Sequence, residues 1–455
     1  MSNTMDKAQR AVLIVVLASY TMILLDTSIV ITGLPEIRAE LGFSPVMLSW
    51  VQTSYMLAFG GFLMLGARAG DLFGRRRVFL AGLSLFTLSS LVIGAAPNAA
   101  VLLAARAVQG LGAAVLAPST LALLQVHFAE GEERTRALSL YAATAGIGSS
   151  LGLVLGGVFA GWLSWRVGFF INVPVGIAVY LAARHLLTET PASGGSLDIA
   201  SALTSTFGMA ALVFGILRIA EVGPDSLTLA ALALGAVVLM AFFLRQAWST
   251  APLLPLRLFH SPVRSGAYAA RMMFIGAMMG FFFLTTQLMQ NDLGFTPVQA
   301  GLGFLPMTGV TFLASLALPR LTRVLGNGGV LVLAFGCGAL GLFWLSFAGQ
   351  DYLTSVALPM LLLGFGNGSA LGPLTVAGVQ GVQPADAGAA SGLVNVAHQL
   401  GGSLGVAGLA AVAASFGGLH IGLIVAAALL AIGMVTSIAF IARPFASKEF
   451  HHENA

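Results

Sequence analysis

Two charged residues of opposite sign lie inside apolar stretches of the chain. Asp26 lies well within the first such stretch, and Arg106 lies within a later one. A carboxylate in hydrocarbon is costly, so an intramembrane acid is a functional candidate by default. Burial disfavours its charged form and a nearby cation favours it, so its protonation can respond to access from either side. A packing Asp, hydrogen-bonded within its own helix bundle, is the alternative.

The two charges are expected at a similar depth. Counted from the same side of the membrane at about 1.5 Å per residue, Asp26 and Arg106 each lie roughly 10 Å below the outer surface. They can therefore pair or share a water molecule. An ion pair that fixes the bundle and a proton relay both satisfy this geometry, and the sequence leaves both open.

A short charged segment follows the second apolar stretch. It places Asp71 between Gly70 and Gly74 and continues with Arg75 and Arg76. Glycine permits a tight turn, and an aspartate can cap a neighbouring helix end or accept an arginine. We expect a gating latch here and not a substrate site.

Glycines recur at a four-residue spacing in the fifth apolar stretch. They are Gly148, Gly152 and Gly156, and Gly157 follows directly. Small residues at this spacing let membrane helices approach closely. The glycine stripe could serve for helix packing alone or for a contact along which helices slide, and both roles require the same surface of small residues. Because the glycines lie inside an apolar helix, no nucleotide site is expected.

Several uncharged polar residues lie within the apolar stretches and could line a substrate cavity. The candidates are Gln52, Tyr55, Gln287, Asn395, His398 and Gln399. His398 could titrate near neutral pH, although a lone histidine among glycine and alanine is as often a packing residue. Arg271, near the inner end of its stretch, could extend to the membrane surface.

The composition indicates an integral membrane protein. Of 455 residues, 58% are hydrophobic and 8% are charged, with a mean hydropathy of +0.94. Soluble proteins carry roughly a quarter charged residues. The sequence contains no paired intramembrane carboxylates, metal-ligand cluster or Ser/His/Asp constellation, so we expect neither an enzyme nor a metal or cofactor. The basic residues cluster between apolar stretches, so a nucleic-acid partner is not indicated.

The apolar stretches predict fourteen membrane-spanning helices, each of about 20 residues. The expected spans are 11–33, 46–66, 78–96, 100–125, 137–160, 166–187, 198–219, 226–246, 267–290, 297–318, 329–348, 353–378, 388–415 and 419–442. With the N-terminus inside, nearly all lysines and arginines outside the spans fall on the cytoplasmic side. Both termini are therefore predicted to be cytoplasmic.

An internal repeat divides the predicted spans. The run from Leu41 to Val46 returns from Leu293 to Val298, and the same spacing carries Gly74 onto Gly326. This spacing equals eight spans. It predicts an N-terminal six-helix bundle (1–190), two inserted helices with a cytoplasmic linker (191–264) and a C-terminal six-helix bundle (265–455). Parallel repeats of this kind place the substrate near the midplane between the halves.

With these motifs the sequence resembles the major facilitator superfamily, and within it the fourteen-span drug:proton antiporter family. The matching segments are Leu25 to Pro35, Gly70 to Arg77, Arg106 to Gly112, and Trp165 to Pro174. The resemblance implies a major facilitator fold and proton-coupled export of amphipathic, often cationic drugs. It also implies that Asp26 and Arg106 act in coupling.

The sequence departs from the family pattern in two ways, one of which concerns the direction of transport and the other the charge of the substrate. The segment from Gly152 to Gly157 lacks the proline usual in the span-5 antiporter motif, and spans 9 to 14 contain no deep acidic residue. Our main hypothesis is a proton-coupled antiporter that exports amphipathic small molecules by alternating access, driven by the proton gradient. The alternative is a proton-coupled transporter of one endogenous metabolite or lipid, by export or symport. We expect a monomer in contact with membrane lipid, in a bacterial inner membrane.

Overall fold

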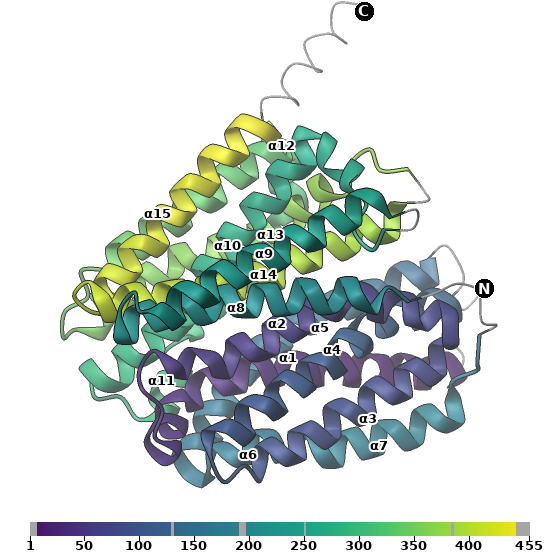
Figure 1. Cartoon of the computed structure of the whole chain (residues 1–455), viewed down its shortest axis with the longest axis horizontal. Helices are drawn as coiled ribbons and strands as arrows, with labels where there is room; N and C mark the ends of the chain where they lie inside the picture. The colour runs from purple at the N-terminus through teal and green to yellow at the C-terminus, as the bar shows by residue number, and fades with distance from the viewer. Residues whose placement is uncertain (1–6, 129–131, 191–196, 250–251, 384–385, 443–455) are drawn as a thin grey trace, which may run out of the picture. The chain divides into compact units, whose positions relative to one another are not determined.

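The chain is helical throughout the part that the structure describes. The structure is a computed structural model, which describes residues 7–128, 132–190, 197–249, 252–383 and 386–442. These residues contain no strand (Figure 1). Twelve helical stretches among them are long and apolar enough to cross a membrane. The predicted all-α polytopic membrane fold is confirmed for the described residues.

The chain divides into two compact units. Unit 1 consists of Met1–Ser44, Ser54–Thr206 and Thr296–Leu302, and unit 2 of Pro45–Thr53, Phe207–Phe295 and Gly303–Ala455. The predicted division into residues 1–190, 191–264 and 265–455 stays a prediction.

Unit 1 is built from long helices and from two short ones of six residues each, α6 and α11. In chain order these are α1 (Lys7–Leu41), most of α2 (Trp50–Phe73), α3 (Arg75–Gly94), α4 (Ala99–His127), α5 (Glu132–Val158), α6 (Trp165–Phe170), α7 (Asn172–Leu186), the start of α8 (Ile199–Val222) and α11 (Pro297–Leu302). Helix α3 packs on α4 and α7, and α1 packs on α4, α5 and α7 (Figure 1). The polar side chains of α1, α3, α4 and α7 can therefore meet inside this unit.

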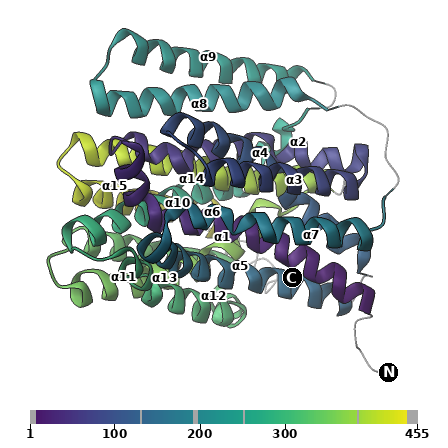
Figure 2. The same ribbon diagram turned by 90° about the horizontal axis from the view of Figure 1, so that it is seen from below.

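Unit 2 contains the remaining long helices. They are the rest of α8, α9 (Ser226–Trp248), α10 (Pro262–Gln287), α12 (Leu305–Leu345), α13 (Leu358–Gly378), α14 (Ala387–Ser415) and α15 (Leu419–Ser437). Helix α10 packs on α13, α14 and α15. Helices α8 and α9 run side by side (Figure 2). The glycine at Gly235 permits their close approach, because its missing side chain would lie against the backbone oxygen of Gly208.

Three predicted spans differ from the twelve candidate stretches. Predicted spans 297–318 and 329–348 both overlap one stretch, Pro297–Leu345. Its main helix, α12, contains a non-helical residue at Gly326 and has 41 residues, about twice the length that a bilayer requires. Predicted span 137–160 corresponds to α5, which is not among the twelve stretches. The count of fourteen therefore stays a prediction.

The internal repeat is visible in the backbone. Gly42 and Gly294, which the repeat aligns, have φ angles of 71° and 67°. Gly74 and Gly326, the next aligned pair, have φ angles of 95° and 65°. Residues other than glycine rarely adopt a positive φ angle. The repeat therefore places a glycine at corresponding helix breaks in its two copies.

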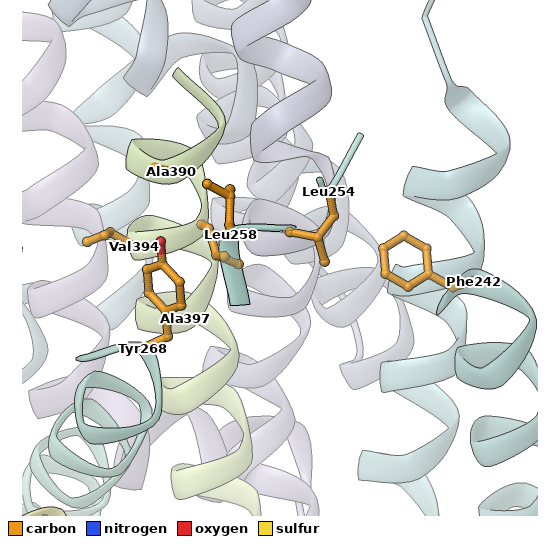
Figure 3. Close-up of a cluster of buried hydrophobic side chains, with 8 residues drawn as sticks. Phe242, Leu254, Leu258, Tyr268, Ala390, Val394 and Ala397 are labelled. Carbon is orange, nitrogen blue, oxygen red and sulfur yellow. The ribbon is translucent and has the colours of Figure 1, made fainter. Parts of the chain in front are cut away.

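A buried apolar cluster joins four segments of unit 2 (Figure 3). It brings Phe242 of α9 and the segment before α10 against α10 and α14. Its members are Phe242, Leu254, Leu258, Tyr268, Ala390, Leu393, Val394 and Ala397. The Tyr268 hydroxyl also donates to the Gly378 carbonyl at 2.7 Å, which links α10 to α13.

Candidate functional site

Asp26 and Arg106 form an ion pair inside unit 1. The Nη1 atom of Arg106, on α4, lies 2.6 Å from Oδ2 of Asp26, on α1. The side chain of Arg106 is 1% exposed and that of Asp26 is fully buried. The expected juxtaposition of the two charges is therefore present as a direct contact.

Three neutral polar residues complete the network around the Asp26 carboxylate. Gln109 donates from Nε2 to Oδ1 of Asp26 at 2.7 Å, and Asn172 of α7 donates from Nδ2 to the same oxygen at 3.0 Å. Gln109 also accepts from Arg106 at 2.6 Å and donates to Ser90 of α3 at 2.7 Å. Both carboxylate oxygens are thus satisfied by donors from two helices, as a buried charge requires.

Sequence reasoning did not select Gln109, Ser90 or Asn172. Gln109 follows Arg106 by three residues on one helix, a spacing that puts both side chains on the same face. That spacing is a signal that could have identified it. Ser90 and Asn172 reach the site only because α3 and α7 pack together, which no local pattern reveals.

Aromatic rings cover the Arg106 guanidinium. Its Cζ atom lies 4.4 Å from the ring centroid of Tyr55 and 5.7 Å from that of Phe169. Both rings attract the cation through their electron-rich faces. Tyr55 is 1% exposed and lies beside the ion pair, and its predicted role in lining a cavity stays a prediction.

The other predicted cavity residues are distributed along several helices. Gln52 is 1% exposed, and neither end of its carboxamide has a hydrogen-bond partner among the described residues. Gln287 donates to the carbonyl of Phe283 on its own helix, and Asn395 is exposed on α14. Gln399 is half-buried. The structure does not bring these side chains together, and their cavity role stays a prediction.

Arg271 does not extend to a surface as expected. Its side chain on α10 is buried at 7% exposure, and its Nη1 donates to Oγ1 of Thr375 on α13 at 2.9 Å. Its Nη2 lies 3.5 Å from Nδ1 of His398 on α14. The interior of unit 2 therefore holds a cation between three helices.

The charged segment between α2 and α3 differs in part from the expectation. Gly70 and Asp71 are helical residues of α2, and only Gly74, with φ 95°, forms the turn. The expected turn at Gly70 is wrong because α2 continues through it to Phe73. Asp71 accepts from Arg75 at 3.1 Å, and this ion pair is largely exposed.

The first turn of α3 receives a cap that sequence reasoning did not identify. The two carboxylate oxygens of Glu189 accept the backbone N–H groups of Arg76 and Arg77 at 3.1 and 3.2 Å. Arg76 also donates from its guanidinium to the Arg184 carbonyl at the end of α7. Free backbone donors at a helix start favour a carboxylate. These hydrogen bonds hold the segment after α7 against the start of α3.

The glycine stripe of α5 packs closely on α1, a partner helix that the sequence analysis did not name. A side chain added at Gly152 would come within 2.5 Å of the Ser28 Cβ atom. One added at Gly156 would collide with Thr32 and with the α1 backbone, and one added at Gly148 would meet the Leu24 side chain at 3.3 Å, so that side chain would have to shift. The contact runs along α1 from Leu24 to Thr32, and at Gly152 and Gly156 it leaves no room for a larger residue.

Gly157 serves a second helix contact. A side chain added there would meet the Pro297 backbone at the start of α11. The consecutive residues Gly156 and Gly157 therefore hold α5 against two different helices of unit 1.

The helical fold, the twelve apolar stretches and the apolar surface define a polytopic membrane protein. The family model described as Major Facilitator Superfamily matches residues 16–406, so the chain belongs to this superfamily. Membership indicates a transporter and not an enzyme.

Named relatives include exporters and resistance proteins of bacteria. The chain is 39% identical over 411 residues to the cephamycin export protein of Amycolatopsis lactamdurans, covering 89% of this chain and 85% of the relative. It is 36% identical over 403 residues to a puromycin resistance protein of Streptomyces alboniger, covering 87% and 80%. A multidrug resistance protein of Mycobacterium tuberculosis is 33% identical over 417 residues, covering 90% and 77%.

Solved structures share the fold. The nucleoside transporter NupG superposes with a TM-score of 0.66 at 11% identity, covering 96% of this chain and 100% of that chain. The human organic anion transporter MFSD10 superposes with a TM-score of 0.63 at 17% identity, covering 95% and 100%. At these identities the likeness concerns the fold alone.

Proposed function

We propose that this protein is a proton-coupled antiporter that exports amphipathic small molecules by alternating access. The observation that carries the proposal is the fully buried Asp26 carboxylate, held by Arg106, Gln109 and Asn172. An ionisable group kept at such a cost inside a membrane protein marks a transport pathway or proton relay. Relatives named for drug export and resistance support the direction of transport.

The network gives Asp26 two states with different contacts. The carboxylate accepts three donors, and protonation would remove its charge and weaken each of these bonds. Arg106 would then lose its counter-ion and would still contact Gln109 and the aromatic rings. Proton uptake can therefore change the attachment of α1 to α4 and α7, with energy from the proton gradient and no cofactor.

The glycine contact and the α3 cap are the proposed conformational elements. At its glycines, α5 places no side chain between itself and α1. We propose that α1 can therefore shift along α5 without displacing interlocked side chains. At the other end, Glu189 and the Asp71–Arg75 pair fasten the start of α3. We assign these contacts to the conformational change and not to substrate binding.

We also propose fourteen spans, with α12 counted as two and α5 as one, and both termini on the cytoplasmic side of a bacterial inner membrane. The termini lie outside the described residues. Single cysteines introduced after replacement of Cys337 test this topology. A residue in the predicted loop at Gly326 should react with a membrane-impermeant maleimide only when the cytoplasmic side is open, and labelling from outside would contradict the count.

Proton movement in proteoliposomes tests the function. An internal pH dye would report flux while cationic, neutral and anionic amphiphiles are added to the wild type, Asp26→Asn and Asp26→Glu. Asp225→Asn, at a half-buried carboxylate that is paired with Arg218, is the matched control. We expect substrate-driven flux in the wild type and Asp225→Asn, none in Asp26→Asn, and partial flux in Asp26→Glu.

The same experiment separates the competing hypotheses. Flux in the symport direction would overturn antiport while leaving coupling through Asp26 intact. Folded wild-type protein that is silent across the whole panel would overturn multidrug export and favour a single endogenous substrate. Flux that survives in Asp26→Asn would remove Asp26 from the coupling mechanism.

A further inference from the structure

Unit 2 contains a buried cation whose hydrogen-bonding capacity is only partly used. The Arg271 guanidinium carries five N–H donors. One good contact is made, from Nη1 to Thr375 at 2.9 Å, and two weak ones reach 3.5 Å, to the Leu371 carbonyl and to His398. The Nε atom is buried and has no partner among the described residues.

No described carboxylate compensates this charge. Arg271 forms no salt bridge with the described residues, whereas Arg106 of unit 1 contacts Asp26 at 2.6 Å. The described acidic residues of unit 2 lie at the ends of helices or in the connections between them. They are Glu221, Asp225, Asp292, Asp351 and Asp386.

His398 does not supply the missing negative charge. A guanidinium only donates hydrogen bonds, so the contact at Nδ1 requires that this nitrogen be unprotonated and accept. Thr375 likewise offers a neutral oxygen, and it donates its own proton to the Leu371 carbonyl at 2.8 Å. The cation therefore contacts only three uncharged groups among the described residues, which is an expensive arrangement for a buried charge.

The surrounding helices hold the guanidinium in place. Tyr268 precedes Arg271 by one turn on α10, and Ala397 precedes His398 on α14. Both belong to the buried cluster in Figure 3. Thr375 lies near the end of α13, where Tyr268 bonds to the Gly378 carbonyl. The site is thus built on three packed helices and one rigid cluster.

We propose that Arg271, with Thr375 and His398, binds the anionic group of an amphipathic organic substrate, a carboxylate or sulfonate. The buried and unpartnered Nε and the under-used Nη2 form the edge of the guanidinium that binds a two-oxygen anion in a bidentate manner. This inference rests on the proposed export function and names the substrate class. It reverses the expectation of a cationic substrate for this chain.

Binding of a matched pair of probes tests the assignment. Dansyl-leucine and its methyl ester share an apolar fluorophore and differ in one negative charge at pH 7.5. Fluorescence titration of the purified full-length protein in phosphatidylcholine nanodiscs gives both dissociation constants. We expect the acid to bind at least about tenfold more tightly than the ester, as for hydrogen bonds to a charged group.

Variants assign the preference to one side chain. Arg271→Gln should remove the preference for the acid, Arg271→Lys should retain part of it, and Arg264→Gln should retain all of it. Arg264 is a suitable control because it lies two turns earlier on α10 and already bonds the Leu258 carbonyl at 2.9 Å. Equal affinities for acid and ester in the wild type, or a preference kept in Arg271→Gln, would overturn the proposal.

An anionic lipid headgroup offers the same chemistry as a free substrate anion. Nanodiscs containing phosphatidylglycerol distinguish the two sources. Unchanged binding of dansyl-leucine supports a small-molecule site, whereas its loss would assign Arg271 to lipid and overturn the substrate assignment. The export proposal is tested by proton flux with neutral amphiphiles, and the Arg271 proposal is tested by the ratio of the acid and ester dissociation constants. The two measurements are independent, so failure of one proposal can be distinguished from failure of the other.

Discussion

Arg106 and Asp26 lie 80 positions apart in the chain and 2.6 Å apart in space, with both side chains at most 1% exposed. The pair joins α1 to α4, and Asn172 adds α7 through the same carboxylate. One ionisable group therefore links three helices of unit 1. A change in its charge acts on all three at once, which connects proton binding to helix packing.

The first prediction concerns the cost of leaving one of these charges alone. Asp26→Asn removes the counter-ion of a buried guanidinium and should destabilise the protein by about 3–5 kcal/mol. The double variant Asp26→Asn/Arg106→Gln removes both charges and should recover a large part of this loss. Thermal unfolding in detergent, followed by near-ultraviolet circular dichroism, measures both effects. Additive losses in the double variant would show that the two side chains do not depend on each other.

The second prediction concerns the contact between α1 and α5. Gly156→Ala places a methyl group against the Ile29 backbone and the Thr32 side chain, so the helices must separate. Overpacking of this kind costs about 1–3 kcal/mol and should also reduce transport. Gly408→Ala on α14 is the matched control, because no atom lies within 4 Å of its added Cβ. Equal behaviour of the two variants in unfolding and transport assays would remove the glycine contact from the mechanism.

The third prediction concerns the cap of α3. Glu189→Gln loses one of two backbone N–H contacts and should cost about 0.5–2 kcal/mol, the range of helix caps. Gly74→Ala should cost more, because the residue has φ 95° and an added Cβ would collide with the Glu189 carboxylate. Glu221→Gln, at an exposed position, serves as the control. Amide exchange at the start of α3 reports the cap directly, and protection unchanged in Glu189→Gln would contradict it.

The features that the sequence predicted are those with a strong local signal. A charge in an apolar stretch is rare, so Asp26 and Arg106 could be selected and their common depth calculated. The repeat aligned Gly42 with Gly294 and Gly74 with Gly326, and all four adopt positive φ. Such glycines are required by the backbone itself and leave a pattern that can be read without the fold.

The features that were missed depend on contacts between distant segments. Asn172 is neutral, and neutral polar residues are common in apolar helices, so nothing distinguished it; Gln109 had only its three-residue spacing from Arg106 as a signal. Glu189 lies more than a hundred positions from the backbone N–H groups that it caps. Gly70 was expected to form a turn because glycine permits one, but a helix tolerates glycine at a modest cost and α2 continues through it.

The last prediction concerns the acid stability of unit 2. Asp386, directly before α14, accepts two hydrogen bonds from Arg257, at 2.8 and 2.6 Å. These bonds hold the pKa of the Asp386 carboxyl below its ordinary value. Because the folded-state pKa is lowered, the stabilisation is fully present above the unfolded-state pKa of about 3.9 and is lost as the pH falls through the folded-state value.

The wild type should therefore unfold at a higher temperature than Asp386→Asn by an amount that is constant from about pH 5 to 8 and shrinks below about pH 4. Arg257→Gln should show the same convergence, because it removes the partner of the same carboxylate. Thermal unfolding of the three proteins across this range measures the differences. A gap between wild type and Asp386→Asn that is equally large at pH 3 and pH 7 would mean that packing at the start of α14, and not the ion pair, provides the stabilisation.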